Sequence, residues 1–309
     1  MGKKKILIAT AKPFAKVAVE KIKEKILKAK YELILLERYE DKSKFLSAVE
    51  DVDALIVRSD KVTKDILDAG KKLKIVVRAG AGYDNVDTII AKDKEIVVMN
   101  TPGQNSNAVA ELAIGMMLFN IRNRFNGTSG TELRGKTIGI HAYGNVGKCI
   151  ARIAKGFEMK IYAYDPYIDN ELIKKDNVIP VSSVEELYKK SQYISLHIPA
   201  NEKTKNSINY DLLNLMPHNA TLVNTARKEV ICEESLLKIL EKRDDFKYIS
   251  DIAPDCKDEL EKKYADRVLF TPKKMGAQTL EANVNAGVAA ATQIINYFEN
   301  NDKTFQVNK

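Results

Sequence analysis

Apolar residues gather in short, β-branched runs that are separated by helix-like stretches. The runs form two series along the chain. The first series covers 4–10, 54–59, 73–80 and 95–100, and the second covers 136–142, 160–165, 193–199, 220–226, 248–253 and 268–272. Continuous apolar strands that alternate with helices are typical of parallel sheets covered on both faces. The pattern therefore predicts an α/β fold with two doubly wound domains.

Two longer apolar segments interrupt this alternation. The stretch "NSNAVAELAIGMMLFNIRNR" (105–124) lies between the two series, and "TLEANVNAGVAAATQIINYFEN" (279–300) follows the second. Both have the pattern of long helices, and Asn or Ser can cap the first one. A polar, glycine-containing loop over 125–136 is expected after the first helix.

Composition places the chain among soluble globular proteins. Its 309 residues suit two domains of ordinary size, with 45% hydrophobic and 30% charged residues. No apolar run approaches the roughly 18 residues of a membrane span, and the basic N-terminus leads straight into a strand-like run rather than a signal peptide. The three cysteines are far apart and form no metal or disulfide spacing, which predicts a reduced, cytoplasmic protein.

The formal net charge of +8 has two interpretations. It could attract anionic small molecules or nucleic acid, or it could reflect a lysine-rich solvated surface. The lysines are spread along the chain between acidic residues, and no basic run is interleaved with aromatic residues. We therefore expect a small-molecule substrate, with neither nucleic acid nor membrane as a partner.

A nucleotide-binding signature opens the second series. The stretch "IGIHAYGNVGKCIARIA" (138–154) has the order strand, turn, helix, and a dinucleotide fingerprint places glycines at the first, third and sixth positions of such a turn. These positions are Ala142, Gly144 and Gly147. Gly144 lets the backbone approach a pyrophosphate, Gly147 lets the helix pack close to the strand, and the helix N-terminus attracts the phosphates. Ala142 departs from the pattern, and we expect the turn to tolerate its methyl group.

An acidic residue follows at the expected distance. The next strand ends in Asp165, eighteen residues after Gly147. A carboxylate there can accept hydrogen bonds from both ribose hydroxyls of an adenosine, and its charge repels a 2′-phosphate. The spacing predicts NAD rather than NADP.

Taken together, eight stretches resemble the D-2-hydroxyacid dehydrogenase family, and most closely its short D-3-phosphoglycerate dehydrogenase branch. They are 56–63, 76–87, 97–117, 135–148, 162–167, 194–199, 222–237 and 275–282. The resemblance implies two Rossmann-like or flavodoxin-like domains. It implies a discontinuous substrate-binding domain over 1–104 plus 280–309, an NAD-binding domain over 105–279, and a homodimer.

The resemblance also implies the substrate-binding residues. Arg227 in "NTAR" matches an arginine that grips the substrate carboxylate and 2-oxygen, a role that suits the planar, permanently charged guanidinium. The backbone amides of Gly80, Ala81 and Gly82 would bind the carboxylate as well, since glycine permits a close approach. Arg58 matches an arginine that faces the substrate, and is expected to bind a phosphate.

For the cofactor, the resemblance assigns the nicotinamide carboxamide to Asp251 in "SDIA". Thr225 and Ala226 would lie in the same cofactor wall. No metal is expected. The full set of residues expected to contact NAD is Gly144, Asn145, Val146, Gly147, Asp165, Pro199, Thr225, Ala226, Asp251 and Gly276.

Two members of the family's usual Arg–Glu–His relay are changed. Cys256 stands at the glutamate position and Asp255 lies one residue earlier, so the orienting carboxylate is displaced or missing. The histidine is missing outright. None of His141, His197 and His218 lies in the last ninety-one residues, and none is placed to replace it.

The histidine position falls in "TPKKMGAQT" (271–279), which holds two lysines. Alignment from the Thr-Pro pair selects Lys273, whereas alignment from the downstream glycine motif selects Lys274. We favour Lys274, because the glycine motif fixes the loop that faces the cofactor. A lysine base must first lose its proton, which desolvation and the positive charge of Arg227 favour. A lysine needs no carboxylate to choose a tautomer, which is consistent with Cys256.

The resemblance implies an NAD-dependent oxidation of 3-phospho-D-glycerate to 3-phosphohydroxypyruvate, the entry to serine synthesis, with Arg227 and Lys274 as catalytic residues. Two alternatives stay open. One is another D-2-hydroxyacid dehydrogenase, which acts on hydroxypyruvate, glyoxylate or lactate. The other is a non-catalytic, NAD-sensing corepressor with the same fold. The lost Glu–His pair favours the corepressor, whereas the retained Arg227 and the lysine substitution argue against it.

The first testable prediction concerns cofactor choice. Asp165 should make NAD preferred over NADP by roughly two or more powers of ten in affinity, because a carboxylate beside a 2′-phosphate costs several kcal/mol in repulsion and desolvation. Asp165→Ser should narrow that gap when dissociation constants for both cofactors are measured. Equal use of NAD and NADP by the unmodified chain would contradict the role of Asp165.

Overall fold

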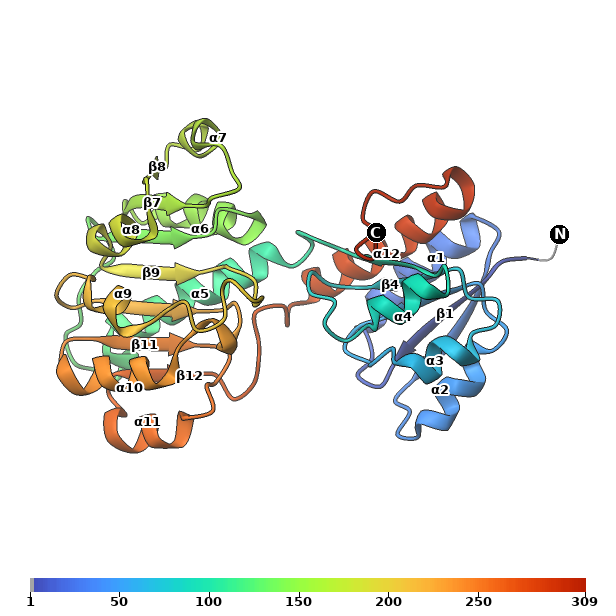
Figure 1. The fold of residues 1–309 in the computed structure, drawn as a ribbon, viewed down its shortest axis with the longest axis horizontal. Coiled ribbons are helices and arrows are strands. Elements are labelled where there is room, and N and C mark those ends of the chain that lie inside the picture. Colours follow the sequence, from blue (N-terminus) through green and yellow to red (C-terminus); the bar gives the residue numbers. More distant parts are fainter. Residues whose placement is uncertain (1–2) are drawn as a thin grey trace. The chain divides into compact units, whose positions relative to one another are not determined.

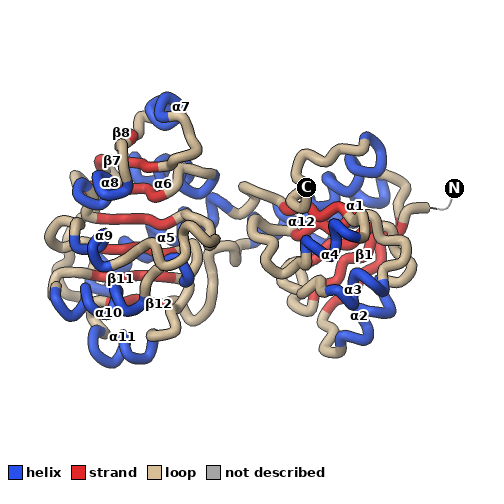
Figure 2. The backbone as a smooth tube through the Cα atoms, viewed as in Figure 1, coloured by secondary structure: helices blue, strands red, loops and turns tan. Residues whose placement is uncertain are grey.

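The computed structural model describes residues 3–309, which divide into two units. One unit combines Met1–Asn105 with Gln278–Lys309, and the other is Ser106–Ala277. Each unit contains one parallel sheet with helices on both faces (Figure 1, Figure 2). The α/β fold class with two doubly wound sheets is therefore confirmed.

The first unit has five parallel strands in the order β2-β1-β3-β4-β5. This is the flavodoxin-like order, in which the second strand lies at one edge and the chain then crosses over the first. The strands are β1 (Lys5–Thr10), β2 (Glu32–Glu37), β3 (Ala54–Val57), β4 (Ile75–Arg78) and β5 (Val97–Asn100).

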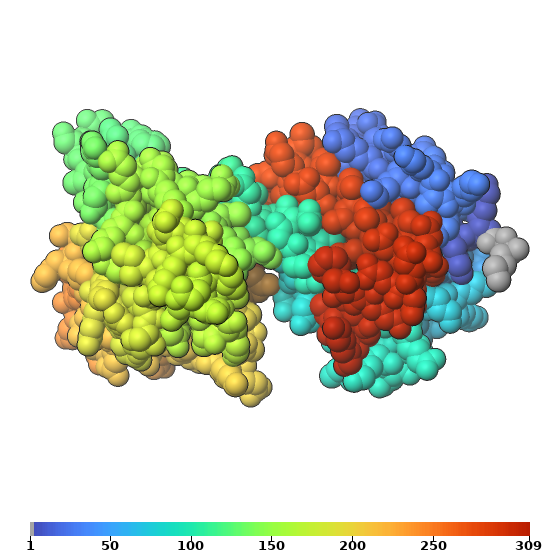
Figure 3. All heavy atoms as spheres, turned by 90° about the horizontal axis from the view of Figure 1, so that it is seen from above, coloured from blue at the N-terminus to red at the C-terminus, as the bar shows by residue number. Residues whose placement is uncertain are grey.

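Helices from the two ends of the chain cover one face of this sheet. Helices α1 (Lys16–Lys28) and α12 (Leu280–Asn300) pack on each other and share a core cluster with the sheet. The other face is covered by α2 (Lys42–Val49), α3 (Lys64–Ala69) and α4 (Thr88–Asp93). Figure 3 shows the red C-terminal segment packed among the blue and teal atoms of this unit.

The segment after α12 covers the outer edge of β5. The amide of Val307 donates to the carbonyl of Val98 at 2.9 Å. The buried side chain of Asn308 then imitates a peptide, since its Oδ1 accepts from the amide of Val98 and its Nδ2 donates to the carbonyl of Ile96. This edge therefore has its backbone hydrogen bonds filled, as an exposed edge strand requires.

The second unit has seven parallel strands in the order β12-β11-β10-β9-β6-β7-β8. Counted from β6, this is the strand order of a Rossmann fold with one further strand. The strands are β6 (Thr137–His141), β7 (Lys160–Tyr164), β8 (Ile179–Pro180), β9 (Tyr193–Leu196), β10 (Thr221–Asn224), β11 (Lys247–Ser250) and β12 (Val268–Phe270).

Two core clusters lie on opposite faces of the seven-stranded sheet. One face carries α5 (Ser106–Ile121), α6 (Asn145–Gly156) and α7 (Asn170–Lys175). The other carries α8 (Val184–Lys190), α9 (Tyr210–Asn214), α10 (Glu233–Lys242) and α11 (Lys257–Tyr264). Two 3₁₀ turns, η1 (Asn123–Phe125) and η2 (Lys228–Val230), complete the elements.

The hydrophobic pattern identified ten of these strands and did not pick out β2 and β8. Strand β2 is an edge strand whose six residues are exposed or half-buried throughout, so it lacks the continuous burial of the other strands. Strand β8 is two residues long and lies at the edge of its sheet. Strand β2 was therefore missed because it is nowhere continuously buried, and β8 because two residues are too few to form a pattern.

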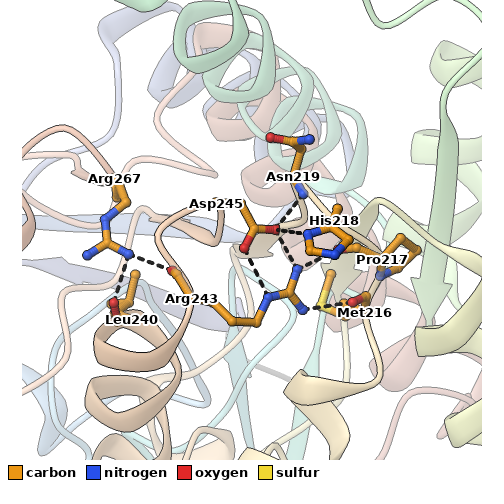
Figure 4. Close-up of polar contacts among 8 residues, drawn as sticks. All are labelled: Met216, Pro217, His218, Asn219, Leu240, Arg243, Asp245 and Arg267. Carbon is orange, nitrogen blue, oxygen red and sulfur yellow. Dashed lines mark hydrogen bonds and ion pairs between the residues drawn. The ribbon is translucent and has the colours of Figure 1, made fainter.

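An arginine bridge stabilises the amino ends of β10, β11 and β12. We define it as Arg243, Asp245 and Arg267 (Figure 4). Arg243 donates to the carbonyls of Met216 and Pro217 at 2.7 Å each, and to both carboxylate oxygens of Asp245. Arg267 donates to two carbonyls at the C-terminal end of α10. The bridge thus ties together the segments at the amino ends of these three strands.

Burial makes this bridge stronger than the surface ion pairs. The side chains of Arg243 and Asp245 are only 14% and 22% exposed. The bidentate contact with Arg243 lowers the pKa of Asp245 to about 2. By contrast, the Arg134–Glu158 pair has side chains that are 68% and 64% exposed. Solvent screening leaves such a pair with little net effect on stability.

We expect Arg243→Ala to lower the free energy of unfolding by about 2–4 kcal/mol, because it leaves a half-buried carboxylate and two carbonyls unpaired. Arg243→Lys should recover only part of this, since an ammonium cannot reproduce the planar fork. Urea unfolding followed by circular dichroism measures the change. Arg134→Ala is the control, with an expected loss below about 1 kcal/mol. Equal losses in the two alanine variants would refute the structural role of the bridge.

Candidate functional site

The residues proposed to bind the cofactor lie at the carboxyl edge of the seven-stranded sheet. The turn with Gly144 follows β6, Pro199 follows β9, Thr225 follows β10, and Asp251 follows β11. The strand order reverses between β6 and β9, and ligands of open α/β sheets bind outside the carboxyl ends at such a switch point. Strand order alone thus brings together residues that are far apart in sequence.

The dinucleotide turn has the geometry of its fingerprint, with alanine at a strained position. Ala142 has φ +79°, a left-handed conformation that costs a non-glycine residue about 1–2 kcal/mol. A Cβ on Gly147 would lie 2.5 Å from the carbonyl oxygen of Ala142, so only glycine fits there. A Cβ on Gly144 would meet no protein atom within 4 Å, so the protein's own packing does not demand this glycine. A phosphate that approaches the backbone closely does require a glycine at this position.

Gly144 is the N-cap of α6, and Asn145, Val146 and Gly147 form its first turn. The N–H groups of a first helical turn have no partner within the helix, and they lie at the positive end of the helix dipole. This twelve-residue helix can therefore hold a diphosphate through its backbone.

Asp165 lies beside this turn. Its Oδ2 accepts from the amide of Tyr143 at 2.8 Å, and its Oδ1 accepts from the amide of Tyr167 at 2.9 Å. A carboxylate has about four lone-pair sites, so each oxygen keeps capacity for another donor. The two ribose hydroxyls of an adenosine are such donors.

Two buried polar atoms at the same edge have no protein partner within residues 3–309. They are Thr225 Oγ1 and Asp251 Oδ1, whose residues are 7% and 1% exposed. An unsatisfied buried polar atom costs about 1–3 kcal/mol, so such atoms indicate a missing ligand or water. A carboxamide can donate to Asp251 Oδ1. The donor set at this edge therefore fits a nicotinamide dinucleotide. Ala226 is buried beside them, in the hydrophobic core cluster on the β10 side.

The other oxygen of Asp251 holds the loop that carries the two lysines. Asp251 Oδ2 accepts from the amides of Met275 and Gly276 at 3.1 and 2.7 Å. Lys274 directly precedes this pair of amides, and both lysines are exposed. The carboxylate therefore fixes the backbone that follows Lys274.

Arg227 lies just after β10. Its Nη1 donates to the carbonyl of Ala226, and its own carbonyl accepts from the side chain of Asn224. These contacts fix its backbone in an extended conformation, with φ −146° and ψ 145°. The half-buried guanidinium is thereby held at the same carboxyl edge as Asp251.

The two carboxylates near Cys256, those of Asp255 and Glu233, both have other partners. Asp255 forms an ion pair with Lys228. Glu233 accepts from the amides of Asp255 and Cys256 at 2.7 and 2.9 Å. Burial and the adjacent Glu233 raise the pKa of the Cys256 thiol to about 12, so it stays protonated. Neither Asp255 nor Glu233 takes over the role of an orienting carboxylate for a base.

The histidines have structural positions. His141 ends β6 with Nδ1 3.4 Å from the Tyr188 hydroxyl, and His197 follows β9 with Nε2 3.0 Å from the Ser195 hydroxyl. Burial lowers the pKa of His141 to about 4, and burial together with His141 lowers that of His197 to about 3. Both are neutral at physiological pH. The side chain of His218 is 95% exposed at the opposite edge of the sheet (Figure 4).

In the first unit, a glycine loop follows β4. The carbonyl of Gly80 accepts from Thr101, and that of Ala81 accepts from the Asn100 side chain at 2.5 Å. The amide of Gly80 donates to the carbonyl of Arg78 at 2.9 Å, so it is not available for the carboxylate as the resemblance implied. The amides of Ala81 and Gly82 are not used by these bonds, so they can bind an anion. A Cβ on Gly80 would lie 1.7 Å from the Nη1 of Arg78, because that side chain crosses over the glycine.

Sequence reasoning missed Arg78. Its position at the last residue of a buried strand, directly before the glycine loop, was the available signal. Its Nε donates to the carbonyl of Arg58 at 2.9 Å, so the Arg78 side chain lies against the backbone of Arg58. Arg58 in turn donates through Nη1 to the carbonyl of Pro13 at 2.8 Å and lies 5.0 Å from the ring centroid of Phe14. These contacts leave donors of the Arg58 fork for an anion.

The family can now be stated. Residues 111–273 match the NAD binding domain of the D-isomer specific 2-hydroxyacid dehydrogenases. The chain is also 37% identical to a hydroxypyruvate reductase of Thermotoga maritima, over 89% of this chain and 94% of that protein. It belongs to the D-isomer specific 2-hydroxyacid dehydrogenases, and its cofactor is NAD.

Other relatives are D-3-phosphoglycerate dehydrogenases. That of Methanocaldococcus jannaschii is 38% identical over 82% of this chain, which spans about half of that longer protein (51%). The structure is similar to an NAD⁺-bound 3-phosphoglycerate dehydrogenase of Entamoeba histolytica, with 47% identity and a TM-score of 0.91 over 100% of this chain and 99% of that one.

Within the described residues, no helix has the length and apolar content needed to cross a bilayer. Residues 3–309 also contain no group of three or more His, Cys, Asp or Glu side chains arranged to hold a metal ion. The homodimer and the cytoplasmic location stay predictions.

The buried histidines predict an acid-sensitive stability. In the unfolded chain a histidine binds a proton near pH 6.5, whereas folded His141 binds one only near pH 4. The stabilisation is therefore fully present above about pH 6.5 and is lost as the pH falls toward 4, by up to about 3 kcal/mol. Urea unfolding at a series of pH values measures this loss. His141→Gln should flatten the plot of unfolding free energy against pH, whereas His218→Gln should not. An unchanged slope in His141→Gln would contradict this origin.

Proposed function

We propose that the chain oxidises 3-phospho-D-glycerate at C2 to 3-phosphohydroxypyruvate, with NAD as the hydride acceptor. The main support is the 47% identity to the Entamoeba histolytica 3-phosphoglycerate dehydrogenase over the whole chain. The hydroxypyruvate reductase of Thermotoga maritima supports a second candidate, the reduction of hydroxypyruvate. Compared at the same oxidation level, 3-phosphohydroxypyruvate and hydroxypyruvate differ by a phosphate, so the choice between the two candidates depends on whether the chain binds that phosphate.

Two adjacent arginines support the phosphorylated substrate. Arg58 follows β3, and the side chain of Arg78, at the end of β4, lies against the backbone of Arg58. A guanidinium group suits a phosphate, since it offers a planar fork of donors and a permanent charge. The amides of Ala81 and Gly82 then suit the smaller, singly charged carboxylate. We assign the phosphate to Arg58, with Arg78 as an added contributor.

We assign the chemical step to Arg227 and Lys274. Arg227 binds the carboxylate and the 2-oxygen, and stabilises the negative charge that develops on this oxygen as its proton leaves. The unprotonated amine of Lys274 accepts the hydroxyl proton. In the reverse direction, its ammonium returns a proton to the 2-oxygen. NAD, when bound, accepts the hydride from C2.

In this proposal Asp251 helps to position both the cofactor and the base. Its Oδ1 would accept from the carboxamide, while its Oδ2 keeps the backbone after Lys274 in place. The base is therefore held by the residue that recognises the nicotinamide, which helps to set the relative position of the two reacting groups.

Substrate selectivity tests the proposal. The chain should reduce 3-phosphohydroxypyruvate with a kcat/KM about 10²-fold or more above that for hydroxypyruvate, because a site built for a charged group disfavours an analogue that lacks it. Arg58→Gln should narrow this ratio while leaving hydroxypyruvate turnover nearly unchanged. If the unmodified chain turns over both substrates with similar kcat/KM, the phosphoglycerate assignment fails in favour of hydroxypyruvate reduction.

Lys274→Ala should lower kcat by about 10²–10⁴, as expected when a general acid–base is removed. Lys273→Ala is the matched control, since the residue lies next in sequence on the same exposed loop. Because the amine must be unprotonated to accept, oxidation should proceed best at alkaline pH and reduction near neutrality. Steady-state kinetics over a pH series measures both effects, and calorimetry should show nearly unchanged NAD affinity. Near-normal kcat in Lys274→Ala would exclude the lysine as the base.

A further inference from the structure

Tyr143 occupies an unusual position for a residue in a phosphate-binding turn. Its side chain is fully buried in the core cluster beneath the cofactor edge. Its hydroxyl donates to Asp176 Oδ2 at 3.0 Å, and its amide donates to Asp165 Oδ2 at 2.8 Å. The residue between the fingerprint positions Ala142 and Gly144 is thus anchored through both its backbone and its side chain.

This anchor acts directly on the strained residue. The amide of Ala142 is held by the carbonyl of Tyr164 at 2.9 Å. With the amide fixed, rotation of φ from +79° to a relaxed negative value would swing every following atom of the turn. Tyr143 would have to leave the core, and its hydroxyl would have to leave Asp176. The buried ring therefore opposes the relaxation that alanine would otherwise favour.

We propose that Tyr143 and Asp176 are positioning residues for NAD, which hold the turn in its binding shape although alanine replaces the first glycine of the fingerprint. The shape matters because Gly144 and the first turn of α6 must present their N–H groups to the pyrophosphate. The proposal rests on NAD binding alone, so it is independent of which 2-hydroxy acid the chain oxidises.

The anchor also links the phosphate-binding turn with Asp165, the residue expected to bind the ribose. Asp165 holds the Tyr143 amide with the same carboxylate that is expected to receive the ribose hydroxyls. The hydroxyl of Tyr143 reaches Asp176, which ends α7, the helix that follows Asp165 along the chain. Relaxation of the turn would therefore displace the pyrophosphate contacts. At the same time it would remove the Tyr143 amide, a hydrogen-bond donor, from Asp165.

The test is a double-mutant cycle on NAD affinity. Isothermal titration calorimetry measures the NAD dissociation constant of Tyr143→Phe in the native background and in the Ala142→Gly background. We expect Tyr143→Phe to raise the constant about threefold to tenfold beside Ala142. Beside glycine, which adopts the left-handed conformation without strain, the increase should stay below about twofold. Asp176→Ala should reproduce Tyr143→Phe, and Asp176→Asn, which keeps an acceptor oxygen, should be near normal.

Tyr193→Phe is the matched control. Tyr193 is buried in the same core cluster but lies at the amino end of β9, away from the turn. It should change the melting temperature without changing NAD affinity. If Tyr143→Phe lowers affinity equally in the native and Ala142→Gly backgrounds, the link to strain is overturned. Lowered stability with unchanged NAD affinity in Tyr143→Phe, or an equal loss of affinity in Tyr193→Phe, would overturn the positioning role.

Discussion

Parallel pairing of β6 with β7 on one side and β9 on the other is the constraint on which the second unit depends. All seven strands of this sheet are parallel, so their carboxyl ends lie at one edge. Residues from the turn after β6 to the loop after β12 therefore meet without any motif that joins them in sequence. Because the strand order reverses at β6, crossover helices leave on opposite faces there, and the turn stays accessible to a dinucleotide. The arginine bridge at the amino ends joins the segments that precede three of these strands.

A lysine in place of histidine changes which neighbours a base can tolerate. Histidine benefits from a carboxylate that fixes its tautomer, whereas a nearby carboxylate would keep a lysine charged and prevent it from accepting a proton. In this chain Asp255 is paired with Lys228, and Glu233 is occupied by two backbone amides. The thiol of Cys256 stays neutral. Under the proposed role of Lys274 as the base, the loss of the glutamate and the gain of the lysine are parts of one electrostatic change.

The sequence was sufficient for the central strands, since runs such as 136–142 and 220–226 are apolar on both faces and only a covered parallel sheet buries them. It was not sufficient for β2, whose side chains are half-exposed at an edge. The fingerprint and the strand ends located the proposed NAD contacts. Arg78, Tyr143 and Glu233 were missed, because their roles depend on the direction of a side chain or on a backbone amide far away in sequence. Likewise, only the φ angle of Ala142 reveals that the departure from glycine is strained.

The discontinuous first unit has a consequence for synthesis on the ribosome. Its sheet is finished early, but α1 alone covers one face until α12 has been made, because α12 supplies Ala286, Ala290, Ala291 and Ile294 to that core. The second unit is continuous and can fold as soon as residue 277 has emerged. During that interval the part of this face that α12 later covers, and the edge of β5 that Asn308 later pairs, are open to solvent. The nascent chain therefore exposes part of an apolar sheet face until α12 has been synthesised, and such transiently exposed surface promotes aggregation.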